Sequence, residues 1–501
     1  MLIAMGASKV NTSRRSVGWL GIDIGTSRCK AVVLDDGGRL IGQGAADIPT
    51  RRRPDGEISQ RPQDWLRAVA RAGREAVRGA PQVAIEAIAL TAPAHVAVLS
   101  DIAGTPLTAS LLAFDGRPRE AARAMRARYG DGLFRSTYVH LTAGWTLSQL
   151  GWLKQQEPSW WSSIHSILPE KDWVRFQMTG VATTDPSDAA GTGLYDQANG
   201  MWLNELVEDL GIGRHTLPAV AHAEDPGGAI NRAWARRLGV REGTPVVSGA
   251  TDTAAELVSV DAMRAGTGLV KVASTGTVVG VSDEPLPDAR LMTYPHPYDG
   301  LWYTVGATSA ATVAYQWFRE SILGRKGREP TYAYAEMDAL AARVRAGSDG
   351  LVFVPSLQGE RTPGWDERAR GAFIGLTTAH DVRHLSRAIL EGVGFSIRSC
   401  RDLLREVGAE PAHIRLTGGG MASRVWRSII VDIIGTDARI GPEGPALGAA
   451  LIAAWSTGAR SVRSVGPVRS IAHDRASAKD YDRAYQRYLL AVASARSVDH
   501  A

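Results

Sequence analysis

The chain has 501 residues, of which 44% are hydrophobic and 22% are charged, a composition typical of globular proteins that excludes a disordered chain, a collagen and a coiled coil. Its 57 Lys and Arg residues against 52 Asp and Glu residues leave a net charge of +5, which is weak over this length. Because no run of Lys and Arg with interleaved aromatic residues occurs, we expect no nucleic-acid partner. The length predicts more than one domain.

Targeting and redox signals are sparse. The two cysteines, Cys29 and Cys400, are too few for a disulfide framework and predict a reducing, cytoplasmic location. Residues 1–16 contain too short an apolar stretch for a signal peptide, so we expect a disordered tail there. The longest apolar run, residues 446–455, is too short to cross a bilayer, and no membrane partner is expected.

The first half of the chain alternates strands and helices. Apolar and β-branched runs predict strands, and apolar residues at three- and four-residue steps predict helices. Residues 159–180 mix aromatic and polar side chains, and no element is assigned to them. The expected elements are strands at 19–24, 29–34, 39–42, 85–90 and 245–250, and helices at 62–78, 120–129 and 251–260.

The second half repeats this alternation and begins with a similar hairpin. Gly25-Thr26-Ser27 breaks the first hairpin, and Ser274-Thr275-Gly276-Thr277 breaks its counterpart about half the chain later. One such unit in each half predicts two related α/β lobes, with a boundary near residues 262–267. The expected elements are strands at 268–273, 278–281 and 413–417, and helices at 381–407, with Asp381 as N-cap, and at 422–434.

Several common catalytic motifs are absent. The sequence has no G-x-x-x-x-G-K-[ST], G-x-G-x-x-G, H-E-x-x-H, C-x-x-C or G-x-S-x-G motif, which disfavours P-loop enzymes, dehydrogenases and serine hydrolases. His380 and His384 are four residues apart, but no third ligand is evident, so we interpret them as solvated helix residues rather than as a metal pair.

The Gly25-Thr26-Ser27 turn suggests phosphate binding. A tight turn of glycine and hydroxyl residues presents backbone N–H and side-chain O–H groups on one side, and such a nest binds phosphate oxygens. Asp23 precedes this turn, and a carboxylate beside a phosphate is unfavourable without a cation between them. Asp23 therefore suggests Mg²⁺; the alternative is that Asp23 only forms hydrogen bonds with the turn.

Several segments together resemble the FGGY family of carbohydrate kinases. The resemblance extends from about residue 17 to about residue 490 and includes the family's C-terminal signature at residues 371–391. It implies an α/β, two-domain actin-like ATPase (ribonuclease H-like) fold with an interdomain cleft. Residues 17–262 would form a sugar-binding domain and residues 263–501 an ATP-binding domain. The other matching segments are GIDIGTSRCK (21–30), DPSDAAGT (185–192), GERTP (359–363) and GPALGAA (444–450).

Within this family the chain looks most like the xylulose kinases. This implies ATP-dependent, Mg²⁺-assisted conversion of D-xylulose to D-xylulose 5-phosphate. Another ketose, a polyol or a sugar acid stays open as the substrate because the sugar loop departs from the xylulose-kinase pattern. Ala94 and His95 occupy that loop, with Ala94 in place of Met, and Asp115 lies in a second sugar segment where Ala113 replaces Trp and Phe114 replaces Asn.

The resemblance also implies a catalytic base and nucleotide contacts. Asp252, in GATDTAA (249–255), would accept the proton of the sugar hydroxyl; from the residues alone, a helix N-cap is favoured over a base. The glycines at 418–420 could likewise form a simple left-handed turn. The implied ATP contacts are Gly25, Thr26, Ser27, Thr275, Gly276, Thr277, Gln316, Gly418, Gly419, Gly420 and Ser423.

Two functions of other classes stay open as remote alternatives. One is a chaperone-like or actin-like nucleotide-binding module, and the other is a non-catalytic sugar sensor that has kept the fold. A homodimer is a further possibility.

Overall fold

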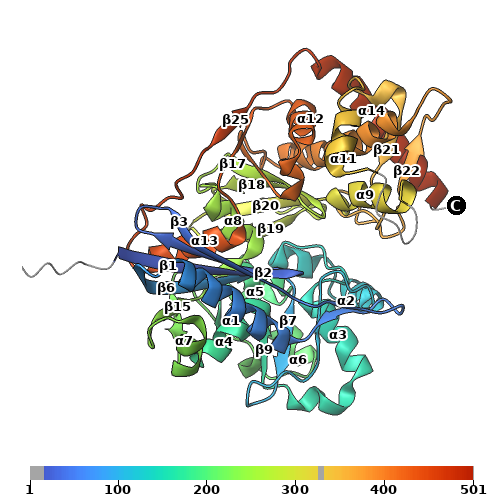
Figure 1. The fold of residues 1–501 in the computed structure, drawn as a ribbon. Helices are drawn as coiled ribbons and strands as arrows, with labels where there is room; N and C mark the ends of the chain where they lie inside the picture. The colour runs from blue at the N-terminus through green and yellow to red at the C-terminus, as the bar shows by residue number, and fades with distance from the viewer. Residues whose placement is uncertain (1–15, 299, 325–331, 500–501) are drawn as a thin grey trace, which may run out of the picture.

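The computed structural model describes residues 16–298, 300–324 and 332–499, which form two lobes, each built around a seven-stranded sheet (Figure 1). Of the predicted disordered tail, residues 1–15 lie outside the described residues. Ser16 already belongs to the first strand, so the predicted tail is one residue too long.

The first sheet is centred on an antiparallel hairpin. Strand β1 pairs with β2 across the predicted Gly25-Thr26-Ser27 turn, β3 extends the sheet beyond β2, and β6 lies parallel to β1 on its other side. The predicted strand at 245–250 is two short strands, each parallel to β6. In the order of the sheet the strands are β14 (Pro226–Ala229), β15 (Pro245–Val247), β6 (Val83–Ala92), β1 (Ser16–Ile24), β2 (Arg28–Asp35) and β3 (Leu40–Asp47), with β16 (Ala250–Thr251) also on β6.

The second sheet repeats this topology. Strand β17 forms an antiparallel hairpin with β18, β20 extends the sheet beyond β18, and β23 and β24 follow in parallel on the other side of β17. The two predicted related lobes and the α/β class are therefore confirmed. In order, the strands are β19 (Met292–Pro295), β20 (Trp302–Ala307), β18 (Gly276–Ser282), β17 (Thr267–Val272), β23 (His413–Thr417), β24 (Ala438–Ile440) and β25 (Arg469–Ile471).

Helices cover the faces of both sheets (Figure 1). The long helix α11 begins after Asp381, whose carboxylate accepts a hydrogen bond from the N–H of Arg383, so the predicted N-cap is confirmed. The α-helices are α1 (Pro62–Gly79), α2 (Arg119–Thr137), α3 (Thr146–Gln156), α4 (Glu170–Thr179), α5 (Pro186–Gly191), α6 (Asn204–Asp209), α7 (Arg232–Leu238), α8 (Asp252–Ser259), α9 (Thr312–Trp317), α10 (Tyr334–Ala341), α11 (Val382–Glu406), α12 (Arg424–Ile434), α13 (Pro445–Ser456) and α14 (Ala478–Asp499).

Shorter elements complete the fold. A π-helix, Phe318–Ile322, continues α9, and short 3₁₀ segments lie at Pro158–Ser163, Arg214–Thr216, Ser348–Gly350 and Gly419–Ala422. The small sheets pair β4 (Arg51–Arg52), β5 (Ile58–Gln60) and β8 (Ser110–Leu111); β7 (Ala97–Ser100) and β9 (Ser166–Pro169); β10 (Thr183–Thr184) and β13 (Ala219–Val220); β11 (Tyr195–Asp196) and β12 (Met201–Trp202); and β21 (Val352–Val354) and β22 (Ala372–Ile374).

One helix from the second half packs on the first sheet. A Cβ atom at Gly21 of β1 would lie 2.0 Å from the Ala446 carbonyl oxygen of α13, and one at Gly448 would lie 1.7 Å from the Ala255 carbonyl oxygen of α8. Only glycine at both positions permits this approach. The predicted division of the chain at residues 262 and 263 falls in the connection between α8 and β17, and it stays a prediction.

His380 precedes helix α11, and His384 lies in its first turn. His384 lies 2.9 Å from the Asp381 carboxylate and 3.3 Å from that of Asp349, and its side chain is only 12% exposed, so the interpretation of His384 as a solvated residue is wrong. Over the described ranges, no helix combines the length and the apolar character that a bilayer crossing requires.

Candidate active site

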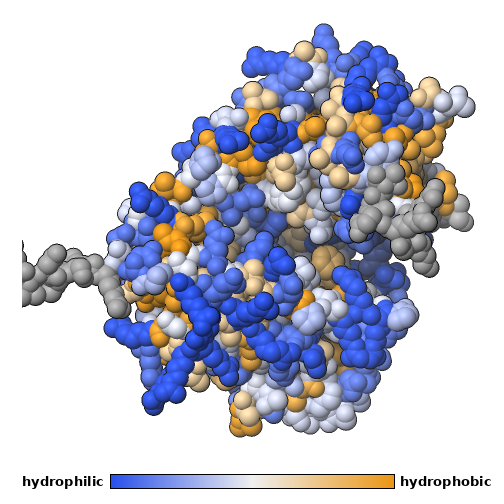
Figure 2. All heavy atoms as spheres, in the orientation of Figure 1, coloured by the Kyte–Doolittle hydropathy of each residue, from blue (hydrophilic) through white to orange (hydrophobic). Residues whose placement is uncertain are grey.

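A cavity between the two lobes contains residues that the sequence singled out. Its volume is about 200 Å³, and Thr26 from the first predicted phosphate turn faces it together with Thr275 and Thr277 from the second. On the face seen in Figure 2, the surface is hollowed between the lobes. The predicted base and the predicted sugar loop also line the cavity, through Asp252, Ala94 and His95.

Asp252 is held at the start of helix α8. Thr251 is the N-cap and Asp252 the first helical residue, so the alternative that Asp252 is itself the cap is wrong. One carboxylate oxygen, Oδ1, accepts hydrogen bonds from the Thr253 N–H at 2.7 Å and from the Thr253 hydroxyl at 3.3 Å. In the described part of the chain no donor bonds the other oxygen, Oδ2, which leaves it available to a ligand in the cavity.

Three carboxylates, those of Asp23, Asp252 and Glu256, lie around one lysine, Lys271. Lys271 of β17 donates a hydrogen bond of 2.5 Å to Glu256 of α8, which joins the two lobes. Burial raises the pKa of Asp252, against the opposing effect of Lys271. Burial and the charge of Asp252 raise the pKa of Asp23 to about 7, although Lys271 and Lys30 oppose this shift. Negative charge is therefore in excess in this part of the cleft.

Asp23 fits the predicted role of a Mg²⁺ ligand. A buried carboxylate whose charge is disfavoured by burial and by a second carboxylate gains when a divalent cation neutralises it. No group of three His, Cys, Asp or Glu side chains among the described residues could hold a metal ion by itself, so Mg²⁺ would also need substrate oxygens. No hydrogen bond to the Asp23 carboxylate is found within the described ranges, which gives no support to the alternative that Asp23 only braces the turn.

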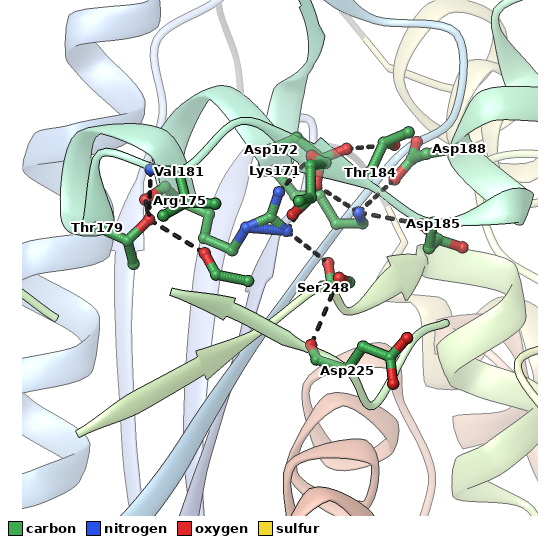
Figure 3. A network of polar contacts seen from close by, with 12 residues as sticks. Lys171, Asp172, Arg175, Thr179, Val181, Thr184, Asp185, Asp188, Asp225 and Ser248 are labelled. Carbon is green, nitrogen blue, oxygen red and sulfur yellow. Dashed lines mark hydrogen bonds and ion pairs between the residues drawn. The ribbon is translucent and has the colours of Figure 1, made fainter. Parts of the chain in front are cut away.

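A buried charged network supports the loop that carries Asp252 (Figure 3). Lys171 of α4 is completely buried and lies 2.7–3.1 Å from carboxylate oxygens of three aspartates, Asp172, Asp185 and Asp188. Asp185 accepts the hydroxyl hydrogen of Ser187, and the Ser187 oxygen in turn accepts the N–H of Thr251 at 3.0 Å.

The same network holds the loop at a second point. Arg175 lies 3.1 Å from Asp172 and donates a hydrogen bond of 3.1 Å to the Ser248 carbonyl (Figure 3). Ser248 and Thr251, on either side of the Gly249-Ala250 segment, are thereby held in place. Because Asp252 follows directly, these bonds help to orient the start of α8.

His95, in the predicted sugar loop, lines the cavity as a neutral imidazole. Its Nδ1 lies 2.8 Å from the Gly191 carbonyl oxygen, which can only accept, so Nδ1 carries the hydrogen and Nε2 presents a lone pair. Burial lowers the pKa of His95 to about 4. Trp145 packs edge-on against the ring at a centroid distance of 4.0 Å, and Tyr294 Oη lies 3.5 Å from Nε2. Because Nε2 carries the lone pair, Tyr294 is the donor of this long hydrogen bond, and a substrate hydroxyl that donates to His95 would replace Tyr294.

A second cavity of about 220 Å³ adjoins the first. Asp115 lines it, but its two carboxylate oxygens accept hydrogen bonds from the Arg117 side chain and one also accepts the N–H of Ile58. In this structure Asp115 braces its own loop, and its contact with sugar stays a prediction. The two cavities share His95, Ala113, Phe114, Met292 and Arg361.

The second phosphate turn is rigidly braced. The N–H of Gly276 donates to Thr308 Oγ1 at 2.9 Å, and the Ser274 carbonyl accepts the N–H of Ala311 at 2.8 Å. In the first turn, the Gln60 amide donates to the Thr26 carbonyl at 2.6 Å. Gly25, Ser27 and Gly276 shape the two turns, whereas the threonines face the cavity.

The glycines at 418–420 lie beside the second turn. Gly418 has φ 91° and ψ 161°, a conformation accessible essentially to glycine alone, so the alternative of a simple left-handed turn is wrong. A Cβ atom at Gly418 would lie 2.6 Å from the Val272 carbonyl oxygen, just before the turn, and the Cβ side of Gly419 is open. Gly420 also packs on Val272. This backbone therefore approaches the turn closely enough for both to contact one nucleotide.

Gln316 and Ser423 lie apart from these features. Gln316 is exposed on α9, where its amide donates to the Glu320 carboxylate. Ser423 is the N-cap of α12, and its hydroxyl oxygen accepts the N–H of Trp426. Neither residue lines the 200 Å³ cavity, and their nucleotide contacts stay predictions.

Three charged residues at the cleft were not predicted from the sequence. Lys271 could have been found as a lone charge in an apolar strand, and Arg361 lies in the GERTP segment, where it was given no role. Glu443 accepts the N–H of Gly418 at 3.0 Å, and burial raises its pKa to about 7. No local sequence pattern indicates a role for Glu443. Its position depends on helix α13, which follows it and packs on the sheet of the first lobe.

The arrangement defines a class of protein. Two lobes of the same topology direct one hairpin turn each toward a common cavity, which the Asp252 carboxylate and the predicted sugar loop also line. Such a site can hold a polyphosphate against a hydroxyl group, which is the requirement for a phosphotransferase of the two-lobed actin-like fold.

Comparison with known proteins identifies the family. The model of the N-terminal domain of the FGGY family of carbohydrate kinases matches residues 18–259, and that of the C-terminal domain matches residues 269–457. A xylulose kinase from Bacillus subtilis (strain 168) is 30% identical over 447 residues, 88% of each chain. A gluconokinase of the same organism is 27% identical over 452 residues, which cover 88% of this chain and 87% of the relative.

A solved structure agrees with this. The crystal structure of xylulose kinase from Rhodospirillum rubrum has a TM-score of 0.88 and 27% sequence identity, covering 97% of this chain and all of that one. The chain belongs to the FGGY family of carbohydrate kinases.

Proposed function

We propose that the protein transfers the γ-phosphoryl group of ATP to a sugar hydroxyl, with D-xylulose as the substrate and D-xylulose 5-phosphate as the product. The observation that carries this proposal is the position of Asp252 in a cavity that residues of both phosphate turns also line. The xylulose kinases among the relatives support the choice of sugar.

In the proposed reaction, Asp252 accepts the proton of the attacking sugar hydroxyl. The sugar oxygen forms a bond to the γ-phosphorus, and the bond from that phosphorus to the bridging oxygen breaks, releasing ADP. A carboxylate with raised pKa suits a general base because it can hold the proton until product leaves. Mg²⁺, held by Asp23 and the ATP phosphates, would supply neutralising charge. Thr26, Thr275 and Thr277 position the phosphates.

The experiment is a coupled assay of ADP release with D-xylulose, D-gluconate, glycerol and no sugar. Release that depends on D-xylulose supports the proposal. Sugar-independent hydrolysis would instead indicate a chaperone-like nucleotide-binding module, and a thermal shift with sugar but no ADP would indicate a non-catalytic sensor.

A kinase for a sugar acid is the second candidate, and Arg361 favours it. This side chain lines both cavities, and burial lowers its pKa. Within the described ranges no carboxylate lies within ion-pairing distance of Arg361, so a carboxylate on the substrate would provide its missing partner. Release of ADP with D-gluconate but not D-xylulose would decide for this candidate; another ketose or a polyol is tested in the same panel.

We also propose a cytoplasmic location and a homodimer. ATP is the phosphoryl donor of the proposed reaction, and both cysteines are free and buried. For a dimer, exposed apolar residues of α14, Leu490 at 70% and Val498 at 76%, offer a contact surface. Sedimentation analysis of the purified chain tests the dimer.

A further inference from the structure

A larger cavity lies at the other end of the second sheet. It has a volume of about 560 Å³ and is formed where β17, β23 and β24 begin, beside residues 260–264, which lead from the first lobe to the second. Strand β23 runs from His413 at this cavity to Thr417, next to Gly418 at the cleft. The cavity is therefore separated from the active site by the length of the strands, and neither phosphate turn contributes to it.

Three arginines line this cavity without a carboxylate partner. Arg415 and Arg439 occupy paired positions on the parallel strands β23 and β24, so their side chains emerge on the same face, and Arg264 lies on the connection between the lobes. In the described part of the chain none of the three lies within 4.0 Å of a carboxylate oxygen. Burial and the charge of Arg439 lower the pKa of Arg415, as expected for like charges placed side by side.

The carboxylates of the cavity are engaged elsewhere. Asp261 forms an ion pair of 2.9 Å with Arg463, and Asp437 lies 2.7 Å from His473 Nδ1. The end of α12 also faces the cavity, but the carbonyl of Ile434 accepts a hydrogen bond from Arg401. Asp261 offsets part of the charge of Arg415 from a distance, but within the described residues none of the three arginines has a carboxylate in ion-pairing contact, so positive charge is in excess at this cavity.

We propose that this cavity binds a phosphate monoester of a sugar, with Arg264, Arg415 and Arg439 contacting the phosphate. Guanidinium groups match phosphate oxygens in geometry and charge, and a phosphate monoester carries close to two negative charges at neutral pH. A cavity of about 560 Å³ accommodates more than a bare phosphate. No Trp, Tyr or Phe is found among the described residues that line it, so only His413, His473 and the arginines themselves could stack on a nucleotide base, which the AMP titration tests.

The test is a calorimetric titration of the full chain with D-xylulose 5-phosphate, inorganic phosphate, sulfate and AMP. We expect D-xylulose 5-phosphate to bind at the cavity and also in the cleft, where it would be the product. The double variant Arg415→Gln/Arg439→Gln should lose the cavity site, with affinity there reduced at least tenfold, and keep the cleft site and the kinase activity. Arg469→Gln on the neighbouring strand β25, which does not line the cavity, is the matched control.

The outcomes separate this proposal from the proposed function. If the cleft binds no sugar phosphate, the wild type shows one site and the double variant none, and the cavity proposal stands. Equal numbers of sites in the wild type and the double variant would overturn it. Sulfate binding as tightly as the sugar phosphate, or AMP binding more tightly, would also overturn it. Arg264→Gln, on an exposed connection, provides the same comparison if the double variant does not fold.

Discussion

Two lysines, Lys171 and Lys271, each face several carboxylates, but in opposite settings. Lys171 is completely buried, and its three aspartate partners are almost completely buried too (Figure 3). Lys271 is 23% exposed, is bonded to Glu256 alone, and lines the cavity between the lobes. A closed network can only support its neighbours, whereas an open one can exchange its partner for a ligand. We therefore expect Lys171 to stabilise the fold around the site and Lys271 to act in catalysis.

Replacement of Asp252 gives the largest expected effect. Asp252→Asn removes the base from the open cluster, so kcat should fall about 10²–10⁴-fold, while the Kd for ATP stays within about threefold. Steady-state ADP release and a nucleotide titration check this. Asp283→Asn, an exposed residue remote from the cavity, is the control and should behave as the wild type. Unchanged turnover in Asp252→Asn would show that Asp252 is not the general base.

Replacement of Lys171 should act on stability. Lys171→Met leaves buried aspartates without their cation, which costs about 3–5 kcal/mol of the free energy of unfolding. Urea denaturation measures this loss. If Lys171→Met were as stable as the wild type but inactive, the closed cluster would belong to the chemistry and the contrast with Lys271 would fail.

Replacement of Lys271 should act on activity with a smaller effect on stability. We expect Lys271 to exchange Glu256 for an ATP phosphate when the nucleotide binds; Lys271→Met then loses a charge-assisted contact of about 1.5–3 kcal/mol, so kcat/KM for ATP should fall roughly 10- to 100-fold. Lys271 lowers the pKa values of Asp252 and Asp23, so its loss should also move the acid side of the pH profile to higher pH. Lys271→Arg should restore most of both properties. A variant with the wild-type pH profile would contradict the assignment.

The pH dependence of Mg²⁺ binding gives a further test of the open cluster. The pKa of Asp23 is raised to about 7 by burial and by Asp252, so the folded protein holds a proton that the unfolded chain releases near pH 4. Without Mg²⁺, the contribution of Asp23 to stability is therefore largest below pH 4 and is lost as the pH rises to 7. Mg²⁺ affinity should fall about tenfold for each pH unit below 7.

Thermal unfolding between pH 5.5 and 8, with and without Mg²⁺, measures both effects. In Asp23→Asn the pH dependence from this group should disappear and Mg²⁺ should no longer stabilise the protein. A stabilisation by Mg²⁺ that is the same at pH 6 and pH 8 would place the cation elsewhere.

Local sequence patterns predicted the elements around the hairpin turns well. The expected strands at 19–24 and 413–417 and the helix at 381–407 agree with β1, β23 and α11 to within a few residues. These elements could be predicted because their apolar periodicity depends only on residues that are close in the sequence. Helix α4 was missed because its buried face carries Lys171 and Arg175, so it shows no amphipathic pattern.

Which residues come together in the active site could be predicted from the sequence only in part. Asp23, Asp252 and the two turns were found from motifs and resemblance, and the cavity brings residues of both turns to Asp252. Lys271, Arg361 and Glu443 were missed because the tertiary packing alone directs these charges into one cleft. In particular, the crossing of α13 depends on Gly21 and Gly448, whose role is visible only when the helix is in place.

The most direct test is a crystal structure with D-xylulose and a non-hydrolysable ATP analogue. We expect a sugar hydroxyl within about 2.6–3.2 Å of the Asp252 carboxylate, and the terminal phosphate in contact with Thr26 from one lobe and Thr277 from the other. A nucleotide bound away from both threonines, or a sugar whose hydroxyls all lie remote from residue 252, would contradict this expectation.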